Sequence, residues 1–334
     1  MTSTAIREGT VPLTERIRVH RDVDRIEEQP LSEVELLPRL RALWEDRASR
    51  GVIRYPIDDL RRRQVGRLAV QLNPHRVRKE EDLKRPMEDT MPVLERFGDG
   101  PDFLKIHESQ PLQRLVDIEC EPRPLAINVN YAPILPGHSI LIPDPDARRA
   151  QHLSPAALKD AGWLLEHTSS RGFTLGFNSL GSWASINHLH FHCFEYPEGD
   201  MPVMQAPRAM LREEGPRVEK VEDYPLHAIV VTSSDLADRV GGAARFVSVL
   251  QEEDVPHTAL LKGDSIWIFP KTRRRGELTP TGSGYLETGG EIFIGDAELF
   301  ESIDEKALWD ELALGRLEEA RFGELCDRFL EDLW

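Results

Sequence analysis

The sequence is poor in cysteine, with only Cys120, Cys193 and Cys326 among its 334 residues and no CxxC pair. Isolated thiols of this kind predict neither a disulfide framework nor a cysteine-based zinc site, and they indicate a reducing compartment. The sequence also lacks an apolar run of about 18 residues and a charged-then-apolar leader, so it predicts neither a membrane-spanning helix nor a secretory signal. We therefore expect a globular protein of the cytoplasm.

Basic residues are also scarce relative to acidic ones, with 42 Lys and Arg against 58 Asp and Glu and a net charge of −16 at pH 7. Such a surface repels a polyanion, so nucleic acid is not an expected partner. A local basic pocket for one small anionic ligand remains compatible with this balance. The length corresponds to about two domains, or to one large duplicated unit, and it needs no disulfide or structural metal to hold a core.

Polar residues 1–30 show no sustained period and predict a loosely ordered arm. A capping-box pattern at Ser32 and Glu35 predicts the first helix, with Pro38 in its first turns. Further helices are expected from Ser154 and Pro155, and near Ser234. Two amphipathic helices are predicted at 304–313 and 316–331. Short apolar runs bounded by Gly and Pro predict strands at residues 51–55, 67–72, 125–131, 139–142, 173–177, 186–194, 227–232 and 258–269.

Two segments resemble each other, residues 136–143 (PGHSILIP) and residues 262–270 (KGDSIWIFP). Each has a glycine turn that leads into an apolar strand ending in proline. The similarity arises either from internal duplication or from chance likeness between two amphipathic hairpins. In the second segment Asp264 replaces His138, and no histidine cluster follows it.

The residues most indicative of chemistry are His188, His190 and His192, which alternate with Leu189, Phe191 and Cys193. Successive side chains of a strand point to opposite faces, so the three imidazoles are expected on one face and the apolar residues in the core.

Three interpretations of this cluster are open: a zinc site, a histidine nucleophile that attacks phosphorus, and a structural ladder. Strand positions i, i+2 and i+4 span about 13 Å, which is too far for one ion to reach all three rings. The spacing therefore favours the nucleophile, with no metal and no cofactor.

Residues 177–192 (FNSLGSWASINHLHFH) resemble the active-site segment of the histidine-triad superfamily, most closely its branch of GDP-hexose phosphorylases. Other segments resemble that branch in the same order: 43–55, 71–86, 126–143, 255–270 and 317–322. The resemblance implies an α+β fold of two fused histidine-triad-like (HIT-like) halves, each an antiparallel sheet with flanking helices. It implies a flexible arm at 1–30, a catalytic half at 31–215 and a degenerate second half at 216–334.

The resemblance also assigns roles to residues. It implies that His190 is the nucleophile and that His188 orients it, whereas His138 lies in a structural Gly-His turn. The residues that match the phosphate-binding turn are Asn178, Gly181, Ser185 and Asn187. Either Asn128 or Asn130 matches the ribose contact. A basic loop near the phosphates contains Arg76, Lys84 and Arg85, with a solvated basic turn as the alternative interpretation.

The implied activity is nucleotidyl transfer from a nucleoside-diphosphate sugar, with GDP-hexose as the expected substrate. The route passes through a covalent nucleotidyl-His190 to inorganic phosphate and gives a nucleoside diphosphate and a hexose 1-phosphate. No nucleic-acid or membrane partner is expected, and a homodimer is compatible with this interpretation.

The sequence departs from the family at His192, where phosphorylases of the superfamily typically have Gln and hydrolases have His. An imidazole can donate or accept a proton near neutral pH and so could assist attack by water. A hydrolase that releases nucleoside monophosphate is therefore the alternative activity. A non-catalytic protein that binds nucleotide sugars is the second alternative.

Overall fold

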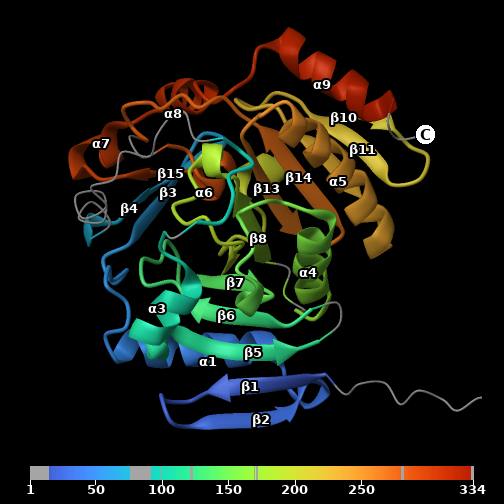
Figure 1. The fold of residues 1–334 in the computed structure, drawn as a ribbon. Helices are drawn as coiled ribbons and strands as arrows, with labels where there is room; N and C mark the ends of the chain where they lie inside the picture. Colours follow the sequence, from blue (N-terminus) through green and yellow to red (C-terminus); the bar gives the residue numbers. More distant parts are fainter. Residues whose placement is uncertain are drawn as a thin grey trace, which may run out of the picture.

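The computed structural model describes residues 15–75, 92–98, 100–120, 123–168, 170, 172–279 and 282–331. Within these residues, twelve strands form one antiparallel sheet in the order β10-β11-β12-β14-β13-β8-β9-β7-β6-β5-β1-β2. Figure 1 shows this sheet running from the β1–β2 hairpin at one end to β10 and β11 at the other. An α+β architecture with a large antiparallel sheet and flanking helices is therefore confirmed.

The sheet contains two five-stranded units with the same topology. The first unit consists of β5 (Arg114–Glu119), β6 (Leu125–Val129), β7 (Ser139–Pro143), β8 (Phe173–Asn178) and β9 (Phe191–Glu195). The second consists of β10 (Arg208–Arg212), β11 (Arg217–Val221), β12 (Ile229–Thr232), β13 (His257–Lys262) and β14 (Ser265–Pro270). In each unit the fifth strand lies between the third and the fourth, and β8 pairs with β13 where the units meet. The sheet is thus built from two equivalent halves.

Each half also has one long helix before its fourth strand, α4 (Pro155–Glu166) in the first and α5 (Leu236–Glu252) in the second. This repeat makes β14 the counterpart of β9 and makes β12 the counterpart of β7. The sequence resemblance between residues 136–143 and 262–270 therefore matches β7 with β14, which is not its counterpart in the structural repeat. The repeat divides the chain between β9 and β10, ahead of the predicted boundary at residue 215.

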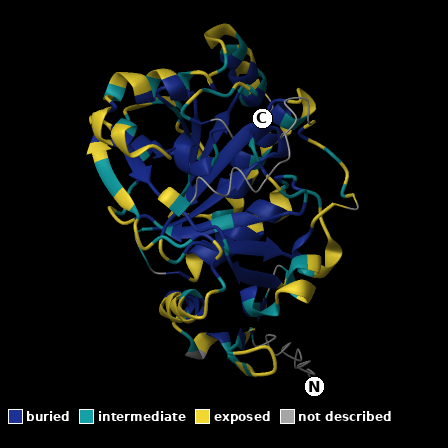
Figure 2. Cartoon of the chain, turned by 90° about the vertical axis from the view of Figure 1, so that its left-hand side faces the viewer, coloured by how far each residue is buried: buried dark blue, intermediate teal, exposed yellow. Residues whose placement is uncertain are grey.

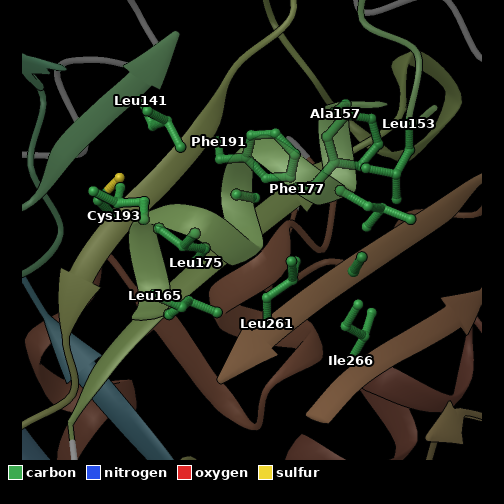
Figure 3. Close-up of a cluster of buried hydrophobic side chains, with 14 of the residues drawn as sticks. Leu141, Leu153, Ala157, Leu165, Leu175, Phe177, Phe191, Cys193, Leu261 and Ile266 are labelled. Carbon is green, nitrogen blue, oxygen red and sulfur yellow. The ribbon is translucent and has the colours of Figure 1, made fainter. Parts of the chain in front are cut away.

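The two faces of the sheet pack against different elements. One face forms the main core with α1 (Leu36–Ser49), α4, α5 and α9 (Glu319–Glu331). Figure 3 shows Phe191 and Cys193 of β9 in this core, close to Leu141 of β7. The opposite face of the first half is covered by α3 (Phe103–Ser109) through a small apolar cluster. Figure 2 shows the buried strands between the more exposed helices and loops.

A second, three-stranded sheet consists of β3 (Arg61–Val65), β4 (Leu68–Leu72) and β15 (Glu291–Ile294), with β15 parallel to β4. It packs with α6 (Tyr285–Thr288), α7 (Ala297–Ser302) and α8 (Glu305–Ala313) on the histidine-bearing face of the large sheet. Strands from the beginning and the end of the chain therefore pair in one sheet, which ties the two halves together.

Several predicted elements are confirmed. Ser154 caps α4 by accepting a hydrogen bond from Ala157 N at 3.2 Å, with Pro155 at the first helical position. Helix α5 begins two residues after Ser234. The predicted strands at 67–72, 125–131, 139–142, 173–177 and 227–232 correspond to β4, β6, β7, β8 and β12, and the two C-terminal helices to α8 and α9.

The arm predicted at 1–30 is wrong for its described part, because β1 (Arg16–His20) and β2 (Ile26–Pro30) form a hairpin that extends the sheet at β5. Pairing with β5 buries Ile17 and Val19 completely. Two alternating apolar residues are too short a pattern to be recognised without that neighbouring strand. Residues 1–14 lie outside the described residues.

Three other predictions need correction. Residues 51–55 form no strand, because Arg47 and Tyr131 carbonyls accept their backbone hydrogen bonds. The strand predicted at 258–269 is the β13–β14 hairpin, with Gly263 in the turn at φ +55°. The cap of α1 is Glu35 rather than Ser32, which lies in a preceding 3-10 turn, although Pro38 does lie in the first turn of the helix.

Candidate active site

The histidine strand is shorter than predicted. β9 begins at Phe191, and the preceding residues are held by a loop instead of by strand pairing. Leu189 N donates to the Arg149 carbonyl at 2.7 Å, and His190 N donates to Gln151 Oε1 at 2.8 Å. Gln151 Nε2 donates in turn to the His190 carbonyl at 3.2 Å. The alternation nevertheless persists, because Leu189, Phe191 and Cys193 all lie in the main core.

His190 has a defined tautomer. Its Nδ1 lies 2.7 Å from the carbonyl oxygen of His188, and a carbonyl can only accept, so Nδ1 carries the hydrogen. The lone pair is therefore on Nε2. The ring is 4% exposed, and burial lowers the pKa of His190 to about 4. A buried neutral imidazole with its lone pair on Nε2 has the form that a nucleophile needs near neutral pH.

His188 is fixed by α3. Phe103 N donates to His188 Nδ1 at 3.1 Å, which leaves the hydrogen of His188 on Nε2. Asp102 caps the same helix by accepting from Leu104 N and Lys105 N, both at 2.9 Å. The Phe103 ring contacts both His188 and His190, with centroids 5.6 and 5.1 Å apart. Burial lowers the pKa of His188 to about 4.

His192 is held by a chain of hydrogen bonds from both halves of the protein. Ile134 N donates to His138 Nδ1 at 3.1 Å, so the hydrogen of His138 is on Nε2. That nitrogen lies 3.0 Å from His192 Nδ1 and 3.1 Å from the Tyr285 hydroxyl. His192 therefore accepts through Nδ1 and carries its own hydrogen on Nε2.

Tyr285 of α6 stacks on His192, with ring centroids 4.4 Å apart. Gly176, which pairs with His192 across the sheet, permits this approach, because an added Cβ would lie 2.6 Å from the Tyr285 ring. The second half of the chain thus supplies one wall of the site, although its own counterpart strand β14 contains no histidine.

The predicted phosphate turn forms the short 3-10 helix Leu180–Ser182 and the segment after it. Asn178 Oδ1 accepts from the Thr258 hydroxyl at 3.0 Å. Asn187 Oδ1 accepts from Gln151 N at 2.9 Å, and its Nδ2 donates to the Arg96 carbonyl at 2.8 Å. Gly181 is buried against Pro256, whereas Ser185 is exposed. Asn187 therefore joins two loops in this structure.

The two candidate ribose residues have different environments. Asn130 Oδ1 accepts from Ala132 N at 2.9 Å, and its amide lies 3.1 Å from the His138 ring. Asn128 is 1% exposed, and both of its amide atoms lack a hydrogen-bond partner among the described residues. Asn128 also lies in one cross-strand row with Ile140 and His192, on the histidine face. Of the two, Asn128 is therefore the residue whose hydrogen-bonding capacity the described residues leave unused.

Arg76, Lys84 and Arg85 lie outside the described residues. Among the described residues, no group of three His, Cys, Asp or Glu side chains is arranged to hold a metal ion. In the same part of the chain, no helix combines the length and apolar character that crossing a membrane requires.

Sequence reasoning missed four residues that shape the site: Phe103, Gln151 and Tyr285, and also Arg114, which pairs with Asn128 across β5 and β6. Pro101-Asp102 is a recognisable start for a short helix, so Phe103 could have been placed after a cap. The other three contact the histidine face only through tertiary packing, and no local pattern marks them.

Comparison with solved structures agrees with this architecture. Yeast Ap4A phosphorylase Apa2, solved in complex with Ap4A, has a TM-score of 0.58 at 15% identity and covers 84% of this chain and 98% of its own. At that identity the likeness establishes the fold. Fold and histidine site together define a HIT-like protein, as the sequence predicted.

The chain belongs to the GDPGP1-like family, whose N-terminal domain matches residues 35–194 and whose C-terminal domain matches residues 201–333. GDP-L-galactose phosphorylase 2 of Arabidopsis thaliana is 28% identical over 322 residues, covering 84% of this chain and 73% of that protein. GDP-D-glucose phosphorylase 1 of Homo sapiens is 28% identical over 230 residues, covering 64% of this chain and 57% of that protein. The predicted family is thereby confirmed.

Proposed function

We propose that this protein is a GDP-hexose phosphorylase that uses His190 as its nucleophile. The observation that carries the proposal is the 2.7 Å hydrogen bond from His190 Nδ1 to the His188 carbonyl, which leaves the Nε2 lone pair of a buried neutral imidazole for attack. The relatives of this chain are phosphorylases of GDP-L-galactose and GDP-D-glucose, which supports the substrate class.

The reaction has two steps. In the first, His190 Nε2 attacks the α-phosphorus of GDP-hexose, an N–P bond forms, and the bond to the bridging oxygen breaks to release hexose 1-phosphate. In the second, an oxygen of inorganic phosphate attacks the same phosphorus, GDP forms, and His190 regains its lone pair. The Nε2 hydrogen of His192 is suited to hydrogen-bond the oxygens that gain charge.

The other residues of the proposal bind the nucleotide and position it. Asn128 would contact the ribose, whereas Asn178, Gly181 and Ser185 would surround the phosphates. The basic loop with Arg76, Lys84 and Arg85 would add positive charge. We also propose that the catalytic half, predicted as 31–215 and ending with β9 in the structural repeat, carries the chemistry, and that the second half contributes the supporting wall with Tyr285. The cytoplasmic location and a homodimer stay predictions; light scattering in solution would test the second.

The direct test is to incubate the protein with GDP-glucose and GDP-L-galactose, with and without phosphate, and to resolve the products. Phosphate-dependent formation of GDP and hexose 1-phosphate is expected. Release of GMP at a rate that does not respond to phosphate would identify a hydrolase instead. Turnover is expected to be unchanged by a strong chelator.

The pH dependence of kcat/KM should reflect the low pKa of His190. Because burial lowers this pKa to about 4, the neutral nucleophile predominates above that pH and is lost only as the pH falls through it. We expect kcat/KM to keep its acidic limb well below pH 6, in initial-rate measurements with buffers of matched ionic strength. An acidic limb centred near 6.5 would contradict a buried neutral nucleophile.

His192→Gln should preserve phosphate-dependent formation of GDP within about tenfold. A Gln amide can accept from His138 Nε2 through its oxygen and donate through its nitrogen, which reproduces both roles of His192. If His192 instead transfers a proton to or from water, turnover should fall by about 10²–10⁴ and covalent guanylyl-enzyme should accumulate. Intact-protein mass spectrometry distinguishes these results.

A further inference from the structure

Arg114 and Asn128 form a buried polar pair beyond the histidines. The two residues are direct partners across β5 and β6, so their side chains lie on the same face of the sheet. Asn128 belongs to the cross-strand row that contains His192, which places Arg114 on the histidine face as well. Both side chains are nearly inaccessible, with exposures of 3% and 1%.

This pair has hydrogen-bonding capacity that the described residues do not use. Within the described part of the chain, the two amide atoms of Asn128 and the Nε of Arg114 have no hydrogen-bond partner. Buried polar groups without partners destabilise a fold, so several at one place point to a ligand that completes their hydrogen bonds. The Arg114 guanidinium is oriented by Asp117, whose Oδ1 accepts from Nη1 at 3.0 Å. Asp117 Oδ2 contacts His20 Nε2 at 2.7 Å, which occupies its second oxygen.

The pair lies at a suitable distance from the histidines. Neighbouring strands are about 4.8 Å apart, so Asn128 is about 10 Å and Arg114 about 14 Å from the β9 strand. A nucleotide with its α-phosphorus at His190 would extend its ribose and then its base in this direction. The charge of Arg114 also contributes to the lowered pKa of His188, so the guanidinium is within electrostatic reach of the catalytic cluster.

Apolar side chains share this face of the sheet with the pair. Phe103, Ala126, Ile140 and Ile142 form a buried apolar cluster on this face, with Ile106 and Ile186 packed against it. A guanidinium has donors only, in a fixed fork that matches two neighbouring acceptors. Guanine presents O6 and N7 as such a pair, whereas adenine presents a donor amino group beside N7.

We propose that Arg114 binds the O6/N7 edge of guanine and thereby selects 6-oxopurine nucleotides over adenine nucleotides. This inference rests on the proposed function, whose substrate it specifies. Hypoxanthine presents the same O6/N7 edge, so Arg114 treats inosine and guanosine nucleotides alike.

The test measures the Kd values of GDP, IDP and ADP by titration calorimetry for the wild-type protein, Arg114→Gln and Arg123→Gln. The wild type is expected to bind GDP and IDP about 10- to 100-fold more tightly than ADP. Arg114→Gln should weaken the binding of GDP and of IDP equally and reduce the preference over ADP to less than about threefold. A glutamine amide both donates and accepts, so it can pair with the guanine edge or with the adenine edge. Arg123→Gln is the matched control, because Arg123 forms an ion pair with Asp160 of α4, away from the histidine face.

Wild-type protein that binds ADP as tightly as GDP overturns the inference without any variant, and so does an Arg114→Gln protein that keeps the full preference. Selective GDP binding without phosphate-dependent turnover overturns the proposed function and leaves the role of Arg114 intact. Phosphorolysis of GDP-hexose and ADP-hexose at equal rates overturns the role of Arg114 and leaves the proposed phosphorylase activity intact. Failure to bind any of the three nucleotides overturns both.

Discussion

His190→Gly is expected to fold and to lose more than about 10⁴-fold in turnover, because removing the nucleophile eliminates the covalent route. The measurement is the initial rate of hexose 1-phosphate formation from GDP-glucose and phosphate. His167→Gly is a suitable control, because His167 is exposed at the end of α4, where its ring stacks on Trp163. A His190→Gly protein that retains a tenth of wild-type turnover would contradict the assignment.

The same variant permits a positive test. Guanosine 5′-phosphorimidazolide already contains the P–N bond that His190 would form, and the glycine leaves space for its imidazole. His190→Gly is therefore expected to convert this compound and phosphate into GDP and imidazole, faster than the spontaneous reaction. Wild-type protein is the control, since its own imidazole fills that space. Formation of GDP by His190→Gly would show that the variant has lost the nucleophile and has kept its folded site.

Glu291→Ala is expected to destabilise the fold by about 3–5 kcal/mol and to lower the Tm by about 10 °C. Glu291 is fully buried at the start of β15. Its Oε1 accepts from Arg62 Nε at 2.6 Å and from Gln71 Nε2 at 2.8 Å, and its Oε2 accepts from the Tyr196 hydroxyl at 2.6 Å. The alanine leaves the buried donors of Gln71 and Tyr196 and the part-buried Arg62 without their common acceptor, where the small sheet meets the end of β9.

Two variants serve as references for the stability of Glu291→Ala, measured by thermal and denaturant unfolding. Glu291→Gln keeps the volume and one acceptor, so we expect a smaller loss than for alanine. Glu301→Ala removes an exposed ion pair with Arg61 and should change the free energy of unfolding by less than about 1 kcal/mol. A Glu291→Ala protein as stable as Glu301→Ala would show that the buried network contributes little.

The sequence predicted the fold best where a local pattern determines where an element begins or ends. Ser154 and Pro155 specify the start of α4, because a capping oxygen and a preset φ act within one turn. The β1–β2 hairpin was missed, because its apolar residues become buried only when β5 lies beside them. Residues 51–55 show the opposite case: an apolar segment predicted as a strand forms none, because its backbone donates to the Arg47 and Tyr131 carbonyls and it pairs with no described strand.

The alternation of histidines with apolar residues is fixed by the sequence, and with it the face of the sheet on which the histidines lie. The sequence also determined the family to which the chain belongs. The hydrogen-bond partners and the tautomers of the histidines follow from the tertiary structure alone, because several of those partners lie far away in the chain. Phe103, 85 residues before His188, and Tyr285, 147 residues after His138, act through the packing of α3 and α6. Strand pairing likewise brought Arg114 opposite Asn128. A local pattern fixes which side chains share a face, whereas hydrogen-bond geometry is fixed only when distant segments meet.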